Sequence, residues 1–166
     1  MRSSAPIIWV LLPLLAAAHA GAWQHEAQRI CEGEMGLPFA LVRGIVRVES
    51  GGHPYVLGVG VGAVWRSYRF EQPQSAKRFL LAALTHTDRI DIGLMQVHWA
   101  TWKRHYALDA TALLDVATNL RVGCDILRRE LAGHGPLWQR IGRYHSRTPA
   151  RNQRYALKVL HASLLP

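Results

Sequence analysis

Glu49 is the residue whose type and position first suggest chemistry. It ends a run of aliphatic residues in the stretch RGIVRVESGG, residues 43–52. If residues 41–50 form a helix, Glu49 shares a face with Ile45 and Val46, which lie four and three residues before it. A carboxylate on an apolar face costs stability unless it is paired or protonated. The spacing leaves two interpretations, a tolerated residue at a helix end or a functional acid.

Two other short segments carry groups that can contact a polar substrate, DIGLMQV at residues 91–97 and GRYHS at residues 142–146. The side-chain amide of Gln96 can both donate and accept hydrogen bonds. Taken singly, both segments have ordinary structural interpretations, because Met95 can pack in a core and Tyr144 can pack on a helix face.

The N-terminus has the features of a secretory signal peptide. Arg2 precedes an apolar stretch at residues 7–17, and Ala-His-Ala at residues 18–20 fits the small-x-small cleavage pattern. We therefore expect residues 1–20 to be removed and residues 21–166 to form one exported, periplasmic domain. The apolar run is shorter than the roughly 20 residues of a membrane span. We expect no stable membrane span after cleavage, with an uncleaved anchor as the alternative.

The formal net charge of +9 is spread along the chain, without a block of five like charges. For an exported protein, this charge favours an anionic envelope polymer or a membrane surface as partner and argues against nucleic acid. No HExxH motif and no zinc-type spacing of Cys and His is present. We therefore predict no metal site and no cofactor.

The chain has two cysteines, Cys31 and Cys124. Outside the reducing cytoplasm, an even pair favours a disulfide. Neither residue lies in a CxxC motif. A cysteine nucleophile is the alternative.

Apolar periodicity, caps and breakers predict a mostly helical domain with a small β insertion. Glycine and valine alternate at residues 55–65, which predicts a short ribbon whose glycines admit close approach by a partner. Asp91 is expected to open a turn or a helix start. Helices are expected at residues 23–35, 38–50, 73–84 and 115–131, from Pro136, and from about residue 150.

Together and in this order, Glu49-Ser50, Gly93-Leu94-Met95-Gln96 and Tyr144 resemble the motifs of lytic transglycosylases of the goose-lysozyme-like superfamily. The resemblance covers nearly all of the mature chain. It implies a mainly α, lysozyme-like helical domain with a small β-ribbon insertion. It also implies cleavage of the β-1,4 bond between N-acetylmuramic acid and N-acetylglucosamine in peptidoglycan glycan strands, with a 1,6-anhydro product.

The resemblance implies a role for each matching residue. Glu49 is the expected catalytic acid, and burial on the apolar face should raise its pKa so that it holds a proton near neutral pH. Ser50 is expected to bond backbone or substrate, and Tyr144 to orient Glu49 or to contact an acetamido group. One residue departs from the pattern, since His145 stands where many members have Asn. The expected substrate-contacting residues are Ser50, Met95, Gln96 and Tyr144.

The segment between Glu49 and Gln96 is long for compact members of the superfamily. It is similar to the insertion in transglycosylases encoded with conjugation, type IV secretion or pilus systems, which implies components of such a machine as partners. One alternative is a hydrolytic muramidase on the same fold, in which Asp91 or another acid positions a water. The other is a non-catalytic, glycan-binding protein of envelope assembly.

Overall fold

The computed structural model describes residues 23–165. The expected signal peptide at residues 1–20 lies outside the described residues. Across the described part of the chain, no helix combines the length and the apolar character needed to cross a membrane.

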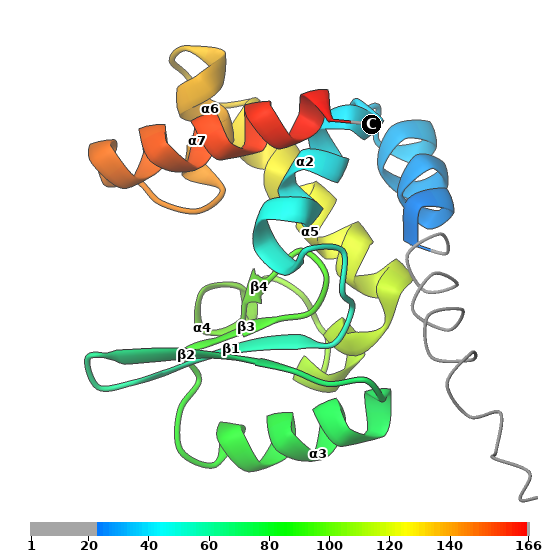
Figure 1. The fold of residues 1–166 in the computed structure, drawn as a ribbon, viewed down its shortest axis with the longest axis vertical. Helices are drawn as coiled ribbons and strands as arrows, with labels where there is room; N and C mark the ends of the chain where they lie inside the picture. The colour runs from blue at the N-terminus through cyan, green and yellow to red at the C-terminus, as the bar shows by residue number, and fades with distance from the viewer. Residues whose placement is uncertain (1–22, 166) are drawn as a thin grey trace, which may run out of the picture.

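Helix α5 (Val116–Leu131) is shared by a helical lobe and a sheet lobe. Asp115 caps it as predicted, because its carboxylate accepts a hydrogen bond of 2.8 Å from the backbone N–H of Thr118. Leu120 lies in the core of the helical lobe, whereas Ile126 lies in the core of the sheet lobe. One helix therefore fixes the relative position of the two lobes (Figure 1).

The helical lobe confirms the expected order of helices. Residues 23–27 are helical and continue into a π-helical stretch, η1. α2 packs closely on α7 because residue 44 is glycine: a Cβ there would meet the carbonyl oxygen of Val159 at 2.6 Å. The elements of this lobe are η1 (Gln28–Glu34), α2 (Phe39–Ser50), α6 (Leu137–Arg143) and α7 (Pro149–Leu164).

The predicted disulfide between Cys31 of η1 and Cys124 of α5 is present, with the two Cα atoms 5.8 Å apart. Both half-cystines are completely buried in the core of the helical lobe. A cysteine nucleophile is therefore the wrong alternative.

The sheet lobe is a four-stranded antiparallel sheet with the strand order β2-β1-β3-β4. α3 covers one face of the sheet (Figure 1). Asp91 lies inside β3, so the expected turn or helix start at this residue is wrong. Its elements are β1 (Val56–Val61), β2 (Val64–Arg69), α3 (Pro73–Leu84), β3 (Ile90–Ile92), β4 (Val97–His98), α4 (Trp99–Trp102) and η2 (Ala110–Leu114).

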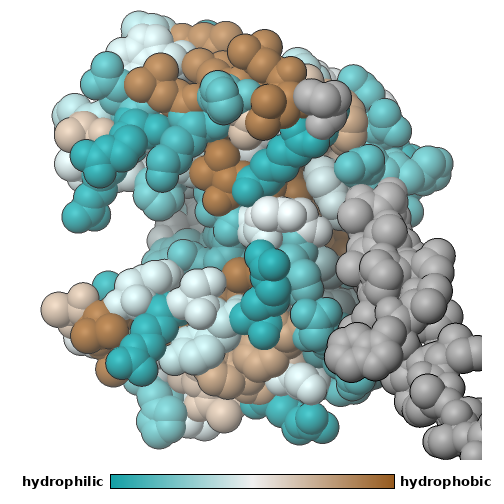
Figure 2. All heavy atoms as spheres, in the orientation of Figure 1, coloured by the Kyte–Doolittle hydropathy of each residue, from teal (hydrophilic) through white to brown (hydrophobic). Residues whose placement is uncertain are grey.

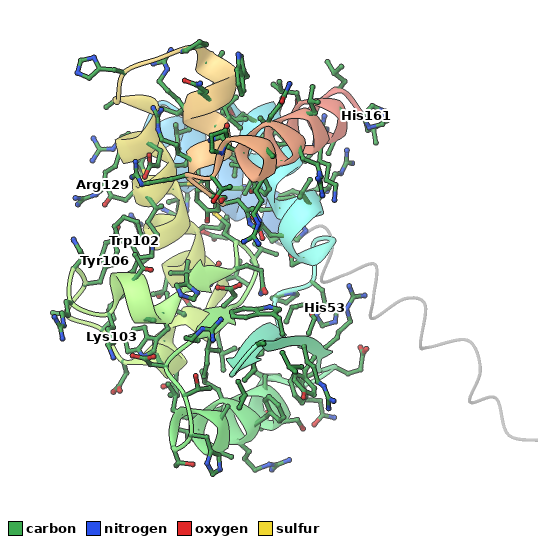
Figure 3. All side chains as sticks on the ribbon, turned by 90° about the vertical axis from the view of Figure 1, so that its left-hand side faces the viewer. His53, Trp102, Lys103, Tyr106, Arg129 and His161 are labelled. Atoms are coloured by element: carbon green, nitrogen blue, oxygen red, sulfur yellow. A yellow bond between two sulfur atoms is a disulfide. The ribbon has the colours of Figure 1, made fainter. Side chains whose placement is uncertain are left out.

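The turn after α4 is tied to α5 by a polar network. Trp102, Tyr106 and Arg129 gather on one side of the molecule (Figure 3). Asp125 accepts hydrogen bonds from the Tyr106 hydroxyl and from the Arg129 guanidinium, both at 2.8 Å.

The glycines of β1 make room for Trp65 of the neighbouring strand. Gly60 and Trp65 are cross-strand partners, and a Cβ at Gly60 would overlap the indole ring. A Cβ at Gly58 would approach the same ring to 3.0 Å. These glycines were expected to admit a partner, and the group that they admit is the Trp65 side chain of the same hairpin.

Candidate active site

A cleft of about 590 Å³ separates the helical lobe from the sheet lobe, and Figure 2 shows the surface hollowed between them. Figure 3 views the molecule from this side. The lining of the cleft includes Glu49, Tyr144 and His145 from the helical lobe and Trp65, Asp91 and Gln96 from the sheet lobe.

Glu49 reaches the cleft because α2 ends directly after it. Gly51 adopts a left-handed conformation with φ of 65°, and its N–H donates to the carbonyl oxygen of Arg47 at 3.1 Å. The buried Ser50 hydroxyl donates to the carbonyl oxygen of Val46 and accepts from the N–H of Gly52. Ser50 therefore bonds backbone, and it is not among the residues that line the cleft.

The pKa of Glu49 is raised from its ordinary value of 4.5 to about 8. Burial is the largest cause, because a desolvated carboxylate is disfavoured. The negative charge of Asp91 acts in the same direction, whereas the hydrogen bond from Tyr155 lowers the pKa. The predicted effect of the apolar face is confirmed: Glu49 holds its proton near neutral pH.

Tyr155, and not Tyr144, is the hydroxyl that contacts Glu49. The Tyr155 hydroxyl donates to Oε1 of Glu49 at 2.6 Å. The Tyr144 hydroxyl donates instead to the carbonyl oxygen of Met95 at 2.8 Å, although Tyr144 still lines the cleft. The sequence pattern placed Tyr155 on the inner face of α7, but its partner is 106 residues away in the chain, so no local signal identified the pair.

The raised pKa of Glu49 predicts a characteristic pH dependence of stability. In the unfolded chain Glu49 ionises near pH 4.5, but in the folded chain only near pH 8. Between these two values the folded chain holds a proton on Glu49 that the unfolded chain has released. The contribution of Glu49 to the free energy of unfolding should therefore be highest below about pH 4.5 and should fall as the pH rises to about 8. Glutamine does not titrate. The stability of Glu49→Gln relative to the unaltered protein should therefore increase across this window, by up to about 1.4 kcal/mol per pH unit.

Urea unfolding of both proteins at several pH values between 4.5 and 8.5 measures this difference. All other titrating groups are common to the two chains and cancel to first order. A difference that stays constant with pH would contradict the burial of a protonated Glu49.

The Gly-Leu-Met-Gln segment is held against α5 by Asn119. The Asn119 side chain accepts from the N–H of Met95 and donates to the carbonyl oxygens of Ile92 and Leu113, all at 2.8 Å. The Met95 side chain is completely buried and packs on Gly123, where a Cβ would approach its sulfur to 2.5 Å. The Met95 side chain thus lies in the core and does not line the cleft.

Gln96 lies in the cleft in a constrained conformation. Its φ of 47° is unusual for a residue with a side chain. Its Nε2 atom donates to the carbonyl oxygens of Val56 and Gly93 at 2.9 and 2.7 Å. Both amide protons are therefore committed to backbone, and Oε1 is the group that remains to accept a hydrogen bond from a ligand.

His145, the residue that departs from the motif, packs on the ring of Tyr155, whose hydroxyl contacts Glu49. Its ring stacks on Tyr155 with centroids 4.8 Å apart and planes 10° apart. Burial lowers the pKa of His145. The uncharged ring helps to bury Tyr155 and forms part of the cleft wall.

The opposite wall carries a hydrogen-bonded pair of side chains and an exposed aromatic ring. Asp91 and His98 are cross-strand neighbours, and Oδ1 of Asp91 lies 2.6 Å from Nδ1 of His98. Trp65 is 42% exposed and packs at a tilt against His98. No sequence motif marks Trp65 or His98, because the strand registers that bring them into the cleft depend on tertiary structure.

A protonated carboxylic acid in a cleft between helices and a small sheet can protonate a glycosidic oxygen, and the architecture is that of a lysozyme-like protein. The model for the Transglycosylase SLT domain matches residues 29–158, and the chain belongs to this family. Membership supports peptidoglycan lytic transglycosylase activity in general and implies peptidoglycan as the substrate. No curated protein and no solved structure matches the chain.

Proposed function

We propose that this protein cleaves the bond between N-acetylmuramic acid and N-acetylglucosamine without water, and that Glu49 is both its acid and its base. The observation that carries the proposal is the position of Glu49: a carboxyl group with a pKa of about 8 faces the cleft and accepts a hydrogen bond from Tyr155. Matching motifs and the family support the same assignment.

In the first step, Glu49 gives its proton to the glycosidic oxygen while the bond from that oxygen to C1 of the muramic residue breaks. Positive charge develops on the muramic ring, and Glu49 becomes a carboxylate. The Tyr155 hydroxyl stabilises this carboxylate, since it already donates to Oε1 at 2.6 Å. Burial raises the pKa of Tyr155, so its hydroxyl keeps the proton that it donates.

In the second step, the C6 hydroxyl of the same muramic residue attacks C1 and gives its proton to Glu49. A 1,6-anhydro ring forms, and the enzyme returns to its starting protonation state. The attack is intramolecular, so it benefits from a high effective concentration and requires no ordered water. Gln96 contributes its free Oε1 as an acceptor for a sugar hydroxyl or amide in the cleft.

Hydrolysis by a muramidase is the second candidate, because one further acid lines the cleft. Asp91 would have to act as the base that activates a water. Its Oδ1 is paired with His98, which makes it less available for that role. We therefore favour the non-hydrolytic reaction.

The product distinguishes the two reactions. Purified sacculi are digested with residues 21–166 in water enriched in heavy oxygen, and the fragments are analysed by mass spectrometry. We expect 1,6-anhydro-muramic ends, lighter by one water than the hydrolytic product and free of label. Labelled, reducing muramic ends would assign the hydrolytic reaction, with Asp91 as the first base to test.

We also propose that the enzyme acts in the periplasm and opens the wall locally for a conjugation, type IV secretion or pilus machine. The support is the insertion between Glu49 and Gln96, which forms the β1–β2 hairpin and α3. Deletion of the gene should reduce assembly of such a machine while bulk growth continues. Unchanged assembly of every such machine in the host would argue for a role in general wall turnover.

A further inference from the structure

The outer face of α7 exposes three leucines, although the inner face of the same helix is buried in the core. Leu157, Leu160 and Leu164 are 62%, 36% and 84% exposed. Their spacing of three and four residues places them on one face of the helix. Figure 2 shows hydrophobic side chains gathered near the top of the molecule, where α7 runs in Figure 1. A contiguous exposed patch of this kind is typical of a contact surface.

A row of cations borders the outer face of α7. Arg151, Arg154 and Lys158 are again spaced by three and four residues, so they follow one flank of the helix beside the leucines. All three are exposed. Within residues 23–165, none of them makes an ion pair or a side-chain hydrogen bond. α7 itself contains no Asp or Glu that could balance their charge.

The two helices that pack on α7 do not balance this charge either. α6 contains no acid. α2 contributes two further cations, Arg43 and Arg47, whose guanidinium groups donate to backbone carbonyl oxygens at the C-terminal end of α7. Glu49 is the one acid in the three helices, and it holds its proton near neutral pH. The leucines therefore lie beside cations that lack an ionised acid on α2, α6 or α7.

An apolar centre with a cationic border fits the surface of a membrane that contains anionic phospholipids. Leucine side chains can enter the boundary between headgroups and acyl chains, while Arg and Lys extend their charged ends to the phosphates. A second copy of the chain fits less well, since the same face of α7 would bring no acid to these cations. The anionic membrane surface supplies both the apolar and the negatively charged part of the contact.

We propose that the outer face of α7 docks the exported enzyme on an anionic phospholipid surface. Such peripheral docking needs no membrane-spanning helix. None of the three leucines lines the cleft, whereas Arg151 of the cationic border does. The docked face therefore lies beside the cleft and leaves the cleft accessible to glycan. The proposal does not depend on the reaction, because docking involves neither Glu49 nor a sugar.

Sedimentation with lipid vesicles tests the proposal. Residues 21–166 are mixed with vesicles of phosphatidylcholine that contain phosphatidylglycerol, or with vesicles of phosphatidylcholine alone. At low salt we expect at least about 10-fold tighter binding to the anionic vesicles, and the difference should shrink as salt is raised. Leu157→Ser with Leu164→Ser should weaken binding about 10-fold or more. Arg154→Gln with Lys158→Gln should have a similar effect.

Matched controls remove the same kinds of side chain elsewhere. Leu81→Ser with Leu108→Ser replaces two other exposed leucines, and Lys77→Gln with Arg78→Gln replaces two exposed cations of α3. Both controls should bind vesicles as the unaltered protein does. Equal binding of the unaltered protein to the two vesicle types, or equal losses in the α7 variants and the controls, would overturn the proposal. The single substitutions Leu157→Ser and Leu164→Ser replace the double variant if it does not fold.

Two further measurements distinguish other roles of the leucines. Cleavage of sacculi, which contain no membrane, should be unchanged in Leu157→Ser with Leu164→Ser. A parallel loss of sacculus cleavage and vesicle binding would assign the leucines to the glycan site and contradict the proposal. Sedimentation equilibrium reports on self-association. If the leucine variant loses a dimer but keeps its affinity for anionic vesicles, a second copy covers the outer face of α7 and the proposal is wrong.

Discussion

Replacing Glu49 with glutamine should abolish glycan cleavage and leave the fold intact. Glutamine has nearly the same shape but cannot transfer a proton to the leaving oxygen. Loss of general acid catalysis typically costs about 10²- to 10⁴-fold in rate. A larger loss is expected here because the same group also acts as the base. Release of soluble fragments from purified sacculi, followed over time, measures the effect.

Glu71→Gln is the matched control, since Glu71 is exposed and does not line the cleft. It should retain full activity. Circular dichroism and thermal unfolding should show that Glu49→Gln is folded, with a melting temperature at neutral pH equal to or above that of the unaltered protein, because a buried acid has been removed. Turnover within tenfold of the unaltered protein would refute the assignment of Glu49.

Of the substitutions proposed for this protein, replacing both Cys31 and Cys124 with alanine should lower the free energy of unfolding most. The disulfide joins residues 93 positions apart and ties η1 to α5. Removing a native disulfide from a small secreted domain typically costs about 2–5 kcal/mol, and long loops lie toward the upper end in the chain-entropy description. Urea unfolding of the double variant and of the oxidised, unaltered protein gives the difference directly.

The reducing agent provides an internal check on this result. Unaltered protein unfolded in the presence of dithiothreitol should approach the stability of the double variant, whereas the double variant should not respond to the reagent. A loss below about 1 kcal/mol, together with free thiols in protein prepared from an oxidising compartment, would show that the bridge does not support the fold.

Local patterns determined the elements that carry the site. Three- and four-residue spacings placed Glu49 on the buried face of α2, and the glycines that follow predicted the end of that helix. Pro73 and Asp115 marked helix starts that the structure confirms. These predictions succeeded because periodicity, capping and backbone restriction act within a few residues of the chain.

Only the tertiary structure decided what each buried or half-buried group contacts. Tyr155 and Glu49 meet because α7 packs on α2, and Trp65 enters the cleft because of the register of the β1–β2 hairpin. Met95 was expected at the sugar, but Gly123 leaves space for it in the core. An apolar periodicity indicates that a face is buried, but it carries no information about the distant segment that packs against that face. That choice depends on contacts between residues far apart in sequence.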